Sequence, residues 1–294
     1  MSPGRARRAR GELVLVATPI GNLGDLSPRA QSVLAESDLI CCEDTRRTRA
    51  LLSAFDIRAG SRLLSLHGHN ETSRLERVAE CVAGGGTVAV VSDAGTPGIS
   101  DPGAWLAGQL AARGEIVTVV PGASSVLAAL VVSGLPTDRF SVEGFLPRKG
   151  TERRRRVAAL LADERTCVIL EAPGRVAATL AELAAADPAR PVAVVRELTK
   201  VHENVWRGTL GDAAASSFEA DPIRGEVVLV VGGAPTVAVA DERDVEAAVR
   251  RAMGEDSDAG PRQVAERVAA SLGVPKRRVY EAALRVRAAG GVQG

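Results

Sequence analysis

A segment rich in glycine, proline and aspartate, VSDAGTPGISDPG at residues 91–103, carries the densest set of residues suited to binding a ligand. It follows a short apolar run at 87–91 and precedes a helical pattern that starts near Ala104. Glycine allows backbone conformations and close approaches that other residues avoid, while proline fixes the chain between them. Such a loop, at the carboxyl end of a strand in an open α/β sheet, is where ligands bind. The segment matches neither GxGxxG nor GxxxxGK[ST], so it predicts neither a dinucleotide site nor a P-loop.

Four further polar segments follow other predicted strands of the first half. They are ATPIGNLGD (17–25), CEDTR (42–46), HGHNE (67–71) and VPGASS (120–125). Any one of them could be an ordinary turn with a helix cap, and Glu43, Asp44 and Thr45 alone are typical of a helix start. Five polar loops at one sheet edge are better explained as a binding site, because α/β proteins build their sites there.

Strand-like and helical segments alternate along the first half of the chain, which predicts a mainly parallel sheet covered on both faces. Ser27 and Pro28 are typical of a helix start. The predicted strands are 13–17, 39–42, 62–66, 87–91 and 116–120, and the predicted helices are 27–36, 45–54, 71–83 and 104–113.

The second half predicts a helix at about 124–133 and then strands that follow one another more closely, as in a more antiparallel sheet. These strands are 140–144, 166–170, 192–196, 205–209 and 227–231. An acidic helix at 241–253 precedes two short helices in 261–287, which form either a helix-turn-helix-like unit or a plain hairpin. The domains that we predict are a basic arm (1–11), two α/β domains (12–122 and 123–235) and a helical segment (236–294).

The net charge of +1 conceals three basic clusters, at residues 5–10, 148–156 and 276–278. Each alone could be a solvated surface, but together they indicate a polyanionic partner. Aromatic residues make up only 2% of the chain, which argues against a protein that stacks many bases on aromatic rings.

Composition also sets expectations about compartment and metals. The four cysteines show no CxxC spacing and lie in apolar surroundings, which indicates reduced thiols in a reducing compartment. Three histidines do not support a zinc site, and we expect no metal. We find no apolar run of membrane-spanning length and no signal core, so we expect a soluble, cytoplasmic protein.

Seven motifs, in order, resemble the family of small-subunit ribosomal RNA methyltransferase I. They are TPIGNLGD, EDTR, HGHNE, SDAGTPGISDPG, SGLPTDRFSVEGFLPRK, EAPGR and RELTK, and the match runs from about Glu12 to Val231 and on into the helical tail. That family belongs to the tetrapyrrole-methylase superfamily of S-adenosylmethionine (SAM) enzymes. It 2′-O-methylates a cytidine in the decoding region of 16S rRNA. The resemblance implies an α/β fold of two tetrapyrrole-methylase-type domains with the cofactor in the cleft between them, and a homodimer acting on the small ribosomal subunit.

The resemblance also assigns the SAM cleft to loops of both domains. The residues that it implies are Thr18, Pro19, Asp93, Ala94, Gly95, Thr96, Gly98, Ser100, Asp101, Ser124, Ser125, Ala172 and Pro173. The chemistry of SAM agrees, because free N–H groups at a helix start near Ser124 suit its carboxylate. Carboxylate or carbonyl oxygens suit its ammonium and sulfonium groups.

The chain departs from the family pattern at three places. LEAPGR (170–175) stands where the family more often has YESPHR, so the phenol, hydroxyl and imidazole of that motif cannot be essential here. Gly68 replaces an acid, and Gly98 replaces a leucine. We interpret these differences as lineage variation because the surrounding motifs are intact.

A ribose 2′-hydroxyl is a poor nucleophile until its proton is drawn off, so a general base would help. The side chains in these loops that could serve are Glu43, Asp44, His67, Asn70, Glu71, Glu197 and Lys200. We favour the segment of Glu197 and Lys200, in which Lys200 would polarise the hydroxyl or hold a phosphate, or form a salt bridge at the domain boundary. Glu43 and Asp44 come next, as base or hydroxyl acceptor.

Arginine forks suit phosphate, so we expect the basic side chains near these loops to contact RNA. They are Arg46, Arg47, Arg148, Lys149, Arg153, Arg154, Arg155 and Arg156, with 276–278 as a second contact. Two other functions remain open. One is methylation of a corrin precursor, although so small a substrate needs neither the basic run nor the C-terminal helices. The other is a non-catalytic RNA-binding or ribosome-assembly protein, which bound SAM or measured turnover would exclude.

Overall fold

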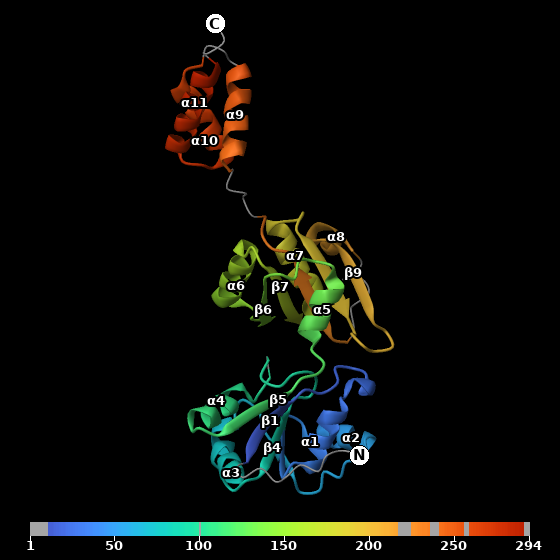
Figure 1. Ribbon diagram of the computed structural model, residues 1–294. Coiled ribbons are helices and arrows are strands. Elements are labelled where there is room, and N and C mark those ends of the chain that lie inside the picture. The colour runs from blue at the N-terminus through green and yellow to red at the C-terminus, as the bar shows by residue number, and fades with distance from the viewer. Residues whose placement is uncertain (1–10, 100, 217–224, 236–240, 256–258, 291–294) are drawn as a thin grey trace. The chain divides into compact units, whose positions relative to one another are not determined.

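The computed structural model describes residues 11–99, 101–216, 225–235, 241–255 and 259–290 (Figure 1). The chain divides into two compact units, 1–234 and 235–294. The predicted basic arm lies outside the described residues except for Gly11. The domain boundary expected after residue 122 falls between two elements of the first unit and stays a prediction.

The first sheet is entirely parallel, with the strand order β3-β2-β4-β1-β5. Its strands are β1 (Glu12–Val16), β2 (Leu39–Cys42), β3 (Leu63–Ser65), β4 (Thr87–Val91) and β5 (Ile116–Val120). They alternate with η1 (Leu23–Asp25), α1 (Pro28–Glu36), α2 (Thr45–Ala54), α3 (Glu71–Ala83) and α4 (Ala104–Ala112). Helices α1 and α2 pack on one face and α3 and α4 on the other, which confirms the predicted parallel sheet with two covered faces (Figure 1).

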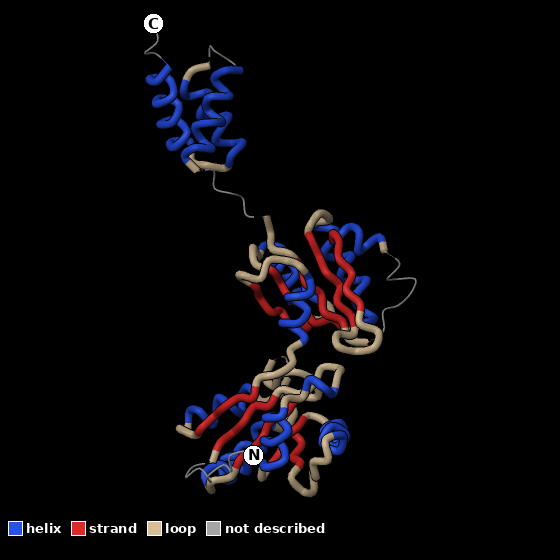
Figure 2. Tube along the Cα trace, turned by 45° about the vertical axis from the view of Figure 1, so that its right-hand side comes forward, coloured by secondary structure: helices blue, strands red, loops and turns tan. Residues whose placement is uncertain are grey.

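The second sheet is mixed, with the order β6-β7-β10-β8-β9, and only β6 and β7 are paired in parallel. Its strands are β6 (Phe140–Phe145), β7 (Thr166–Glu171), β8 (Pro191–Arg196), β9 (Asn204–Thr209) and β10 (Val227–Val231). Its helices are α5 (Ser125–Ser133), α6 (Gly150–Ala162), η2 (Pro173–Arg175), α7 (Val176–Ala186) and α8 (Leu210–Ala215). Helix α5 covers one face, and α6, α7 and α8 contribute to the core on the other. Figure 2 shows the strands of each sheet side by side, with helices packed against them.

The hydrophobic cores hold the cysteines as free thiols. Cys41, Cys42 and Cys167 are buried, and Cys81 is partly buried. Burial raises the pKa of the Cys41 thiol to about 12, and its neighbours Cys42 and Cys81 add to the shift. The thiolate of Cys41 is therefore scarce at neutral pH, which fits a packing role.

The second unit consists of α9 (Glu242–Glu255), α10 (Pro261–Leu272) and α11 (Lys276–Gly290), which share an apolar core. Gly273 adopts a left-handed φ of 63° after α10, as expected of a helix C-terminus. The predicted acidic helix and the two predicted helices in 261–287 are thus confirmed. Of the helices in the described residues, each is too short or too polar to span a membrane.

Candidate functional site

The loops that follow the parallel strands are hydrogen-bonded to one another. The N–H of Thr18, after β1, donates to the carbonyl of Gly95, after β4, at 2.9 Å, and the N–H of Gly95 donates back at 3.1 Å. The hydroxyl of Thr96 donates to the carbonyl of Ala123, after β5, at 3.3 Å. Three of the five predicted loops therefore meet at this sheet edge.

The other two loops are tied to the same segment. The N–H of Asp44, after β2, donates to Asp93 Oδ1 at 3.1 Å. The N–H of Gly103 donates to a carboxylate oxygen of Glu71, the first residue of α3, at 2.5 Å. Gly103 has a φ of 115°, and a Cβ there would lie 3.0 Å from Val90 Cγ1, so only glycine fits without strain. The segment at 91–103 is thus held by the loops after β1, β2, β3 and β5.

A cavity of about 390 Å³, called here the main cavity, opens beside these loops. Both sheets contribute to its wall: the loops after β4 and β5, the end of β7 with the loop after it, and the start of β10. Its lining residues are Ile20, Ala94, Gly95, Thr96, Ile99, Asp101, Ser124, Ser125, Val126, Phe145, Leu170, Glu171, Ala172, Pro173, Gly225, Glu226, Val227 and Val228.

A second cavity of about 420 Å³ shares Ile20, Ala94 and Glu226 with the main cavity. It lies against the loop after β1 and helix α2. Its other lining residues are Thr18, Pro19, Gly21, Leu23, Arg47, Thr48, Ala50, Leu51, Ala54, Ser92 and Asp93.

The residues predicted to bind the cofactor divide between the two cavities. Ala94, Gly95, Thr96, Asp101, Ser124, Ser125, Ala172 and Pro173 line the main cavity, and Thr18, Pro19, Ala94 and Asp93 line the second. Gly98 lines neither cavity, and a Cβ there would meet Ala104 instead. Ser100 lies outside the described residues.

Several lining residues were missed by the sequence reasoning, above all Gly225, Glu226, Val227 and Val228 at the start of β10. No motif marks them, because an apolar strand start resembles any buried strand. One feature of the sequence could have pointed to these residues: Glu226, in the pair Gly225-Glu226, is a charged residue directly before an apolar run.

The lining of the main cavity includes groups of opposite electrostatic character. Ser124 caps α5, accepting a hydrogen bond from the N–H of Leu127 at 3.4 Å, and the first turn of the helix borders the cavity. Unpaired N–H groups and the helix dipole make such a terminus favourable for an anion. Burial raises the pKa of Asp101 to about 6, and the charges of Glu43 and Asp93 add to the shift. These nearby carboxylates favour a cation beside Asp101.

Glu43 and Asp44 differ in the chemistry open to them. Asp44 caps α2, and hydrogen bonds from the side chain and backbone of Arg46 lower its pKa to about 2. Glu43 is exposed, but partial desolvation raises its pKa, and the charge of Asp93 adds to the shift. Asp44 is therefore the weaker proton acceptor of the two.

Lys200 is held between two carboxylates. Its Nζ lies 2.8 Å from Glu197 Oε1 and 3.4 Å from Glu226 Oε2. Burial lowers the pKa of Lys200, but the hydrogen bond with Glu197 and the charge of Glu226 outweigh this, so the pKa is raised. A Cβ on Gly21 would lie 2.5 Å from Lys200 Cγ, which shows how closely the lysine approaches the loop after β1. Lys200 is thus a cation in salt bridges beside the second cavity.

The three remaining base candidates shape loops. The side chain of Asn70 accepts a hydrogen bond from the N–H of His67 at 2.8 Å and donates one to the carbonyl of Ser65 at 3.1 Å. Glu71 is buried and accepts the hydrogen bond from Gly103. These contacts explain HGHNE as a turn that supports the segment at 91–103.

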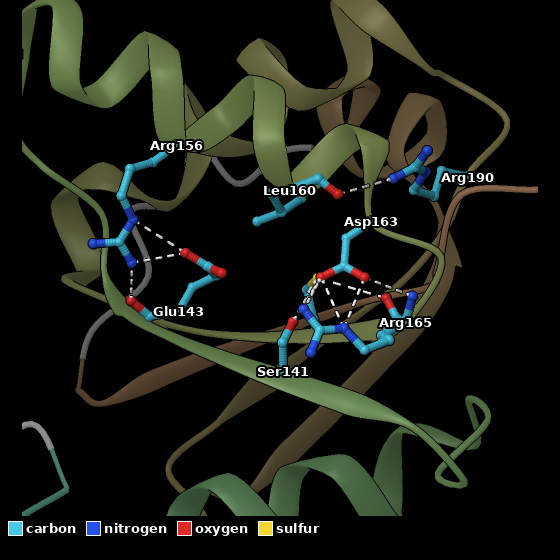
Figure 3. Close-up of polar contacts among 8 residues, drawn as sticks. Ser141, Glu143, Arg156, Leu160, Asp163, Arg165 and Arg190 are labelled. Atoms are coloured by element: carbon cyan, nitrogen blue, oxygen red, sulfur yellow. Dashed lines mark hydrogen bonds and ion pairs between the residues drawn. The ribbon is translucent and has the colours of Figure 1, made fainter.

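The four consecutive arginines of α6 have different surroundings. Arg153 is buried; its Nε donates to Glu182 at 2.7 Å, and another guanidinium nitrogen donates to Thr179 Oγ1 at 3.0 Å. Arg156 is partly buried and binds Glu143 of β6 (Figure 3). Arg154 and Arg155 are exposed. Arg153 was expected to contact RNA, but its guanidinium is engaged inside the fold.

The other predicted RNA contacts lie on the surface. Arg148 and Lys149 are exposed, as are Arg46 and Arg47. The Arg47 guanidinium lies 3.3 Å from Asp93 Oδ2 and lines the second cavity.

A buried polar network connects Arg153 to the main cavity. The Glu171 side chain is fully buried and accepts hydrogen bonds from Thr179 Oγ1 at 2.7 Å and from the N–H of Ala172 at 2.8 Å. Arg175 Nε lies 3.0 Å from Glu171 Oε1. Because Thr179 also accepts from Arg153, the basic helix α6 supports the loop that carries Ala172.

Comparisons with known proteins agree with this architecture. Residues 12–214 match the family model of tetrapyrrole (corrin/porphyrin) methylases. A ribosomal RNA small subunit methyltransferase I of Mycobacterium tuberculosis is 44% identical over 94% of this chain and 96% of its own length. The uroporphyrin-III-C-methyltransferase of Thermus thermophilus shares the fold, with a TM-score of 0.54 and 22% identity over 76% of this chain and 94% of its own. A second crystal structure of that enzyme, complexed with S-adenyl homocysteine, aligns with a TM-score of 0.50 and 22% identity over 75% of this chain and 96% of its own.

Replacing Arg153 should destabilise the fold, whereas replacing its neighbour should not. Arg153→Met leaves Glu182 without its ion-pair partner, so we expect the free energy of unfolding to fall by about 3 kcal/mol. Arg154→Met removes an exposed charge and should change it by less than about 0.5 kcal/mol. Urea unfolding followed by tryptophan fluorescence measures both, since Trp206 packs against the same core. Equal stability of the two variants would contradict the assignment.

Asp101 should make stability depend on pH in a defined direction. The pKa of Asp101 is raised to about 6 in the folded protein. Its contribution to the stability of the fold is therefore most favourable below its unfolded-state pKa of 3.8 and is lost as the pH rises through 6. Asp101→Asn should therefore raise Tm relative to the parent by about 2 °C or more at about pH 8, and by less at about pH 4.

Asp44→Asn is the control, because the pKa of Asp44 is shifted in the opposite direction to that of Asp101. The lowered pKa of Asp44 gives stability that is present above 3.8 and lost as the pH falls towards 2. This variant should lower Tm at about pH 8 and approach the parent in acid. If Asp101→Asn followed the same profile as Asp44→Asn, Asp101 would not have a raised pKa.

Proposed function

Since the chain belongs to the tetrapyrrole (corrin/porphyrin) methylases and, within them, to the family of ribosomal RNA small subunit methyltransferase I, we propose that it is a SAM-dependent rRNA methyltransferase. It 2′-O-methylates a cytidine ribose in the decoding region of 16S rRNA and acts on the small ribosomal subunit. The observation that carries this proposal is the 44% identity to the mycobacterial relative, which extends over 94% of the chain and so reaches into the C-terminal unit.

The main cavity has the groups needed to hold SAM. The first turn of α5, at Ser124 and Ser125, offers N–H groups to the carboxylate. Asp101 lines the same cavity, and the carboxylates near it favour the ammonium and sulfonium groups. Val227 and Val228 supply apolar surface for the adenine. The fold is shared with an enzyme crystallised with S-adenyl homocysteine, which supports the same choice of ligand.

When bound, SAM supplies an electrophilic methyl group, and the protein must orient the ribose and accept its proton. We assign the proton to the Glu43 carboxylate, whose raised pKa makes it a better acceptor than Asp44. The protonated Lys200, fixed by Glu197 and Glu226, holds a phosphate or the hydroxyl oxygen. Asp44 then has no direct part in the reaction, and its role is to cap helix α2.

Exposed basic side chains around the site supply the contacts to RNA. Arg154, Arg155, Arg148 and Lys149 lie on α6 and in the loop before it, and Arg46 and Arg47 begin α2. Their guanidinium and ammonium groups neutralise phosphates, which favours association without reading sequence. Arg153 and Arg156 instead position α6.

We also propose that the protein acts as a homodimer in the cytoplasm. The side chains of Leu127 and Val131 on α5 are 53% and 71% exposed, and Val119 on the edge strand β5 is 49% exposed. Apolar side chains on neighbouring elements are suited to a second copy of the chain. Small ribosomal subunits, the proposed substrate, are cytoplasmic.

The decisive experiment is methyl transfer to a mapped position. Incubation with methyl-labelled SAM and small subunits from a strain lacking the modification should place the label on one cytidine ribose of 16S rRNA. Glu43→Gln should lower kcat by about 100-fold, because a positioned base contributes about that factor. Glu36→Gln, on the exposed end of α1, should leave kcat unchanged. Label on a base ring, or no label on the RNA, would reject the proposal.

The exposed arginines of α6 should affect RNA binding and not SAM binding. The double variant Arg154→Gln/Arg155→Gln removes two phosphate contacts, so we expect about tenfold weaker binding of small subunits at moderate salt. Its Kd for SAM, measured by calorimetry, should stay within about twofold, because neither side chain lines the main cavity. The double variant Arg58→Gln/Arg77→Gln removes the same charge at other exposed positions and should bind subunits normally. Loss of SAM affinity in the Arg154/Arg155 variant would contradict the division of roles.

A further inference from the structure

The charges of the C-terminal unit are divided unequally among its helices. Residues 241–255 carry three basic and five acidic side chains: Arg243, Arg250 and Arg251 against Asp241, Glu242, Asp244, Glu246 and Glu255. Residues 261–290 carry seven basic and two acidic ones: Arg262, Arg267, Lys276, Arg277, Arg278, Arg285 and Arg287 against Glu266 and Glu281. The positive charge of the unit is therefore concentrated on α10 and α11.

Part of this charge is used to assemble the unit. Both guanidinium contacts of Arg285, to Glu242 and Glu246 of α9, are 3.5 Å long. Arg267 of α10 donates a hydrogen bond to the carbonyl of Ala252 at 2.7 Å. These two arginines join α11 and α10 to α9, so the remaining basic side chains are the ones available to a partner.

A groove of about 720 Å³ lies between α10 and the start of α11. It is lined by Arg262, Gln263, Ala265, Glu266, Lys276, Arg277 and Tyr280, and is called here the α10–α11 groove. Lys276 lies 2.5 Å from Glu266, and the Arg277 side chain is 91% exposed, with a long contact of 3.6 Å to Glu281. Within the described part of the unit, Arg262 has no ion pair. The groove thus keeps an excess of positive charge.

Tyr280 gives the groove an aromatic surface. It is the one tyrosine of the chain, and it is 40% exposed at the groove. Leu284, one turn further along α11, is 46% exposed. An exposed aromatic ring beside arginines is the combination that holds an unpaired base and its flanking phosphates.

A hollow elsewhere on the same unit lacks this combination. It has a volume of about 550 Å³ and lies between α9 and α10. Its charged lining residues, Asp244, Arg251, Glu255 and Arg267, balance one another, and none of its lining residues is aromatic. The pairing of net positive charge with an aromatic ring therefore distinguishes the α10–α11 groove.

We propose that the α10–α11 groove binds an unpaired segment of ribosomal RNA, with a base against Tyr280 and neighbouring phosphates on Arg262 and Arg277. This rests on the proposed function, because the substrate supplies the RNA. A second binding module on the same chain raises the affinity for a large substrate without new contacts at the catalytic site. An acidic segment of a ribosomal protein is the competing partner, but the exposed ring favours a nucleobase.

The test compares full-length variants in filter binding to small subunits that lack the modification. Arg262→Gln/Arg277→Gln should weaken binding about tenfold and make the dependence of log K on log salt shallower by about 1.4, that is, about 0.7 for each lost phosphate contact. Tyr280→Ala should weaken binding about tenfold, and Tyr280→Phe, which keeps the ring, should restore it. SAM affinity should be unchanged in all of them.

The matched control is Arg243→Gln/Arg250→Gln, which removes the same charge from α9 and should bind subunits like the parent protein. Equal binding by the groove and control variants would overturn the inference. The inference would also be overturned if the groove variants bound intact subunits more weakly than the parent but bound protein-free 16S rRNA equally well. The partner of the groove would then be a ribosomal protein. Label transfer by the parent protein in the same samples tests the proposed function separately. Circular dichroism checks that each variant is folded.

Discussion

The common direction of the strands in the first sheet is the constraint on which the site depends. Parallel strands bring all their carboxyl ends to one edge, so loops from distant parts of the chain meet there. The loops then hold one another: Thr18 pairs with Gly95, Asp44 with Asp93, and Gly103 with Glu71. Because each loop is anchored by a neighbour, polar segments with little regular structure can present a defined wall to a ligand.

The burial of Glu171 imposes a second constraint, on the other sheet. A charged carboxylate removed from water needs partners, and Arg175 and Thr179 provide them. Thr179 is in turn contacted by Arg153, so the helix that carries the exposed arginines is fixed to the wall of the main cavity. The four arginines therefore serve two purposes, support of the fold and exposure of positive charge. Their position on the helix decides between them: Arg153 and Arg156, three residues apart, lie on the same face and turn inward.

The sequence was informative where a local rule decides the structure. The alternation of strands and helices, the Ser27-Pro28 helix start and the polar loops after the strands all follow from short-range patterns. The contribution of Glu226 and Val227 to the main cavity depends on β10 entering the middle of a mixed sheet, which no local pattern predicts. The burial of Arg153 was hidden for a related reason, because four identical residues differ only in the direction that helix packing gives them.

The position of Glu226 between the two cavities affects how strongly each of them binds a ligand. It lines both the main and the second cavity and forms a salt bridge with Lys200. A ligand in either cavity that changes the charge around this carboxylate also changes the field in the other. The two binding equilibria are therefore linked, and the linkage is reciprocal: whatever the first ligand does to the affinity of the second, the second does to the first. The affinity of each cavity for such a ligand therefore depends, through Glu226, on what occupies the other cavity.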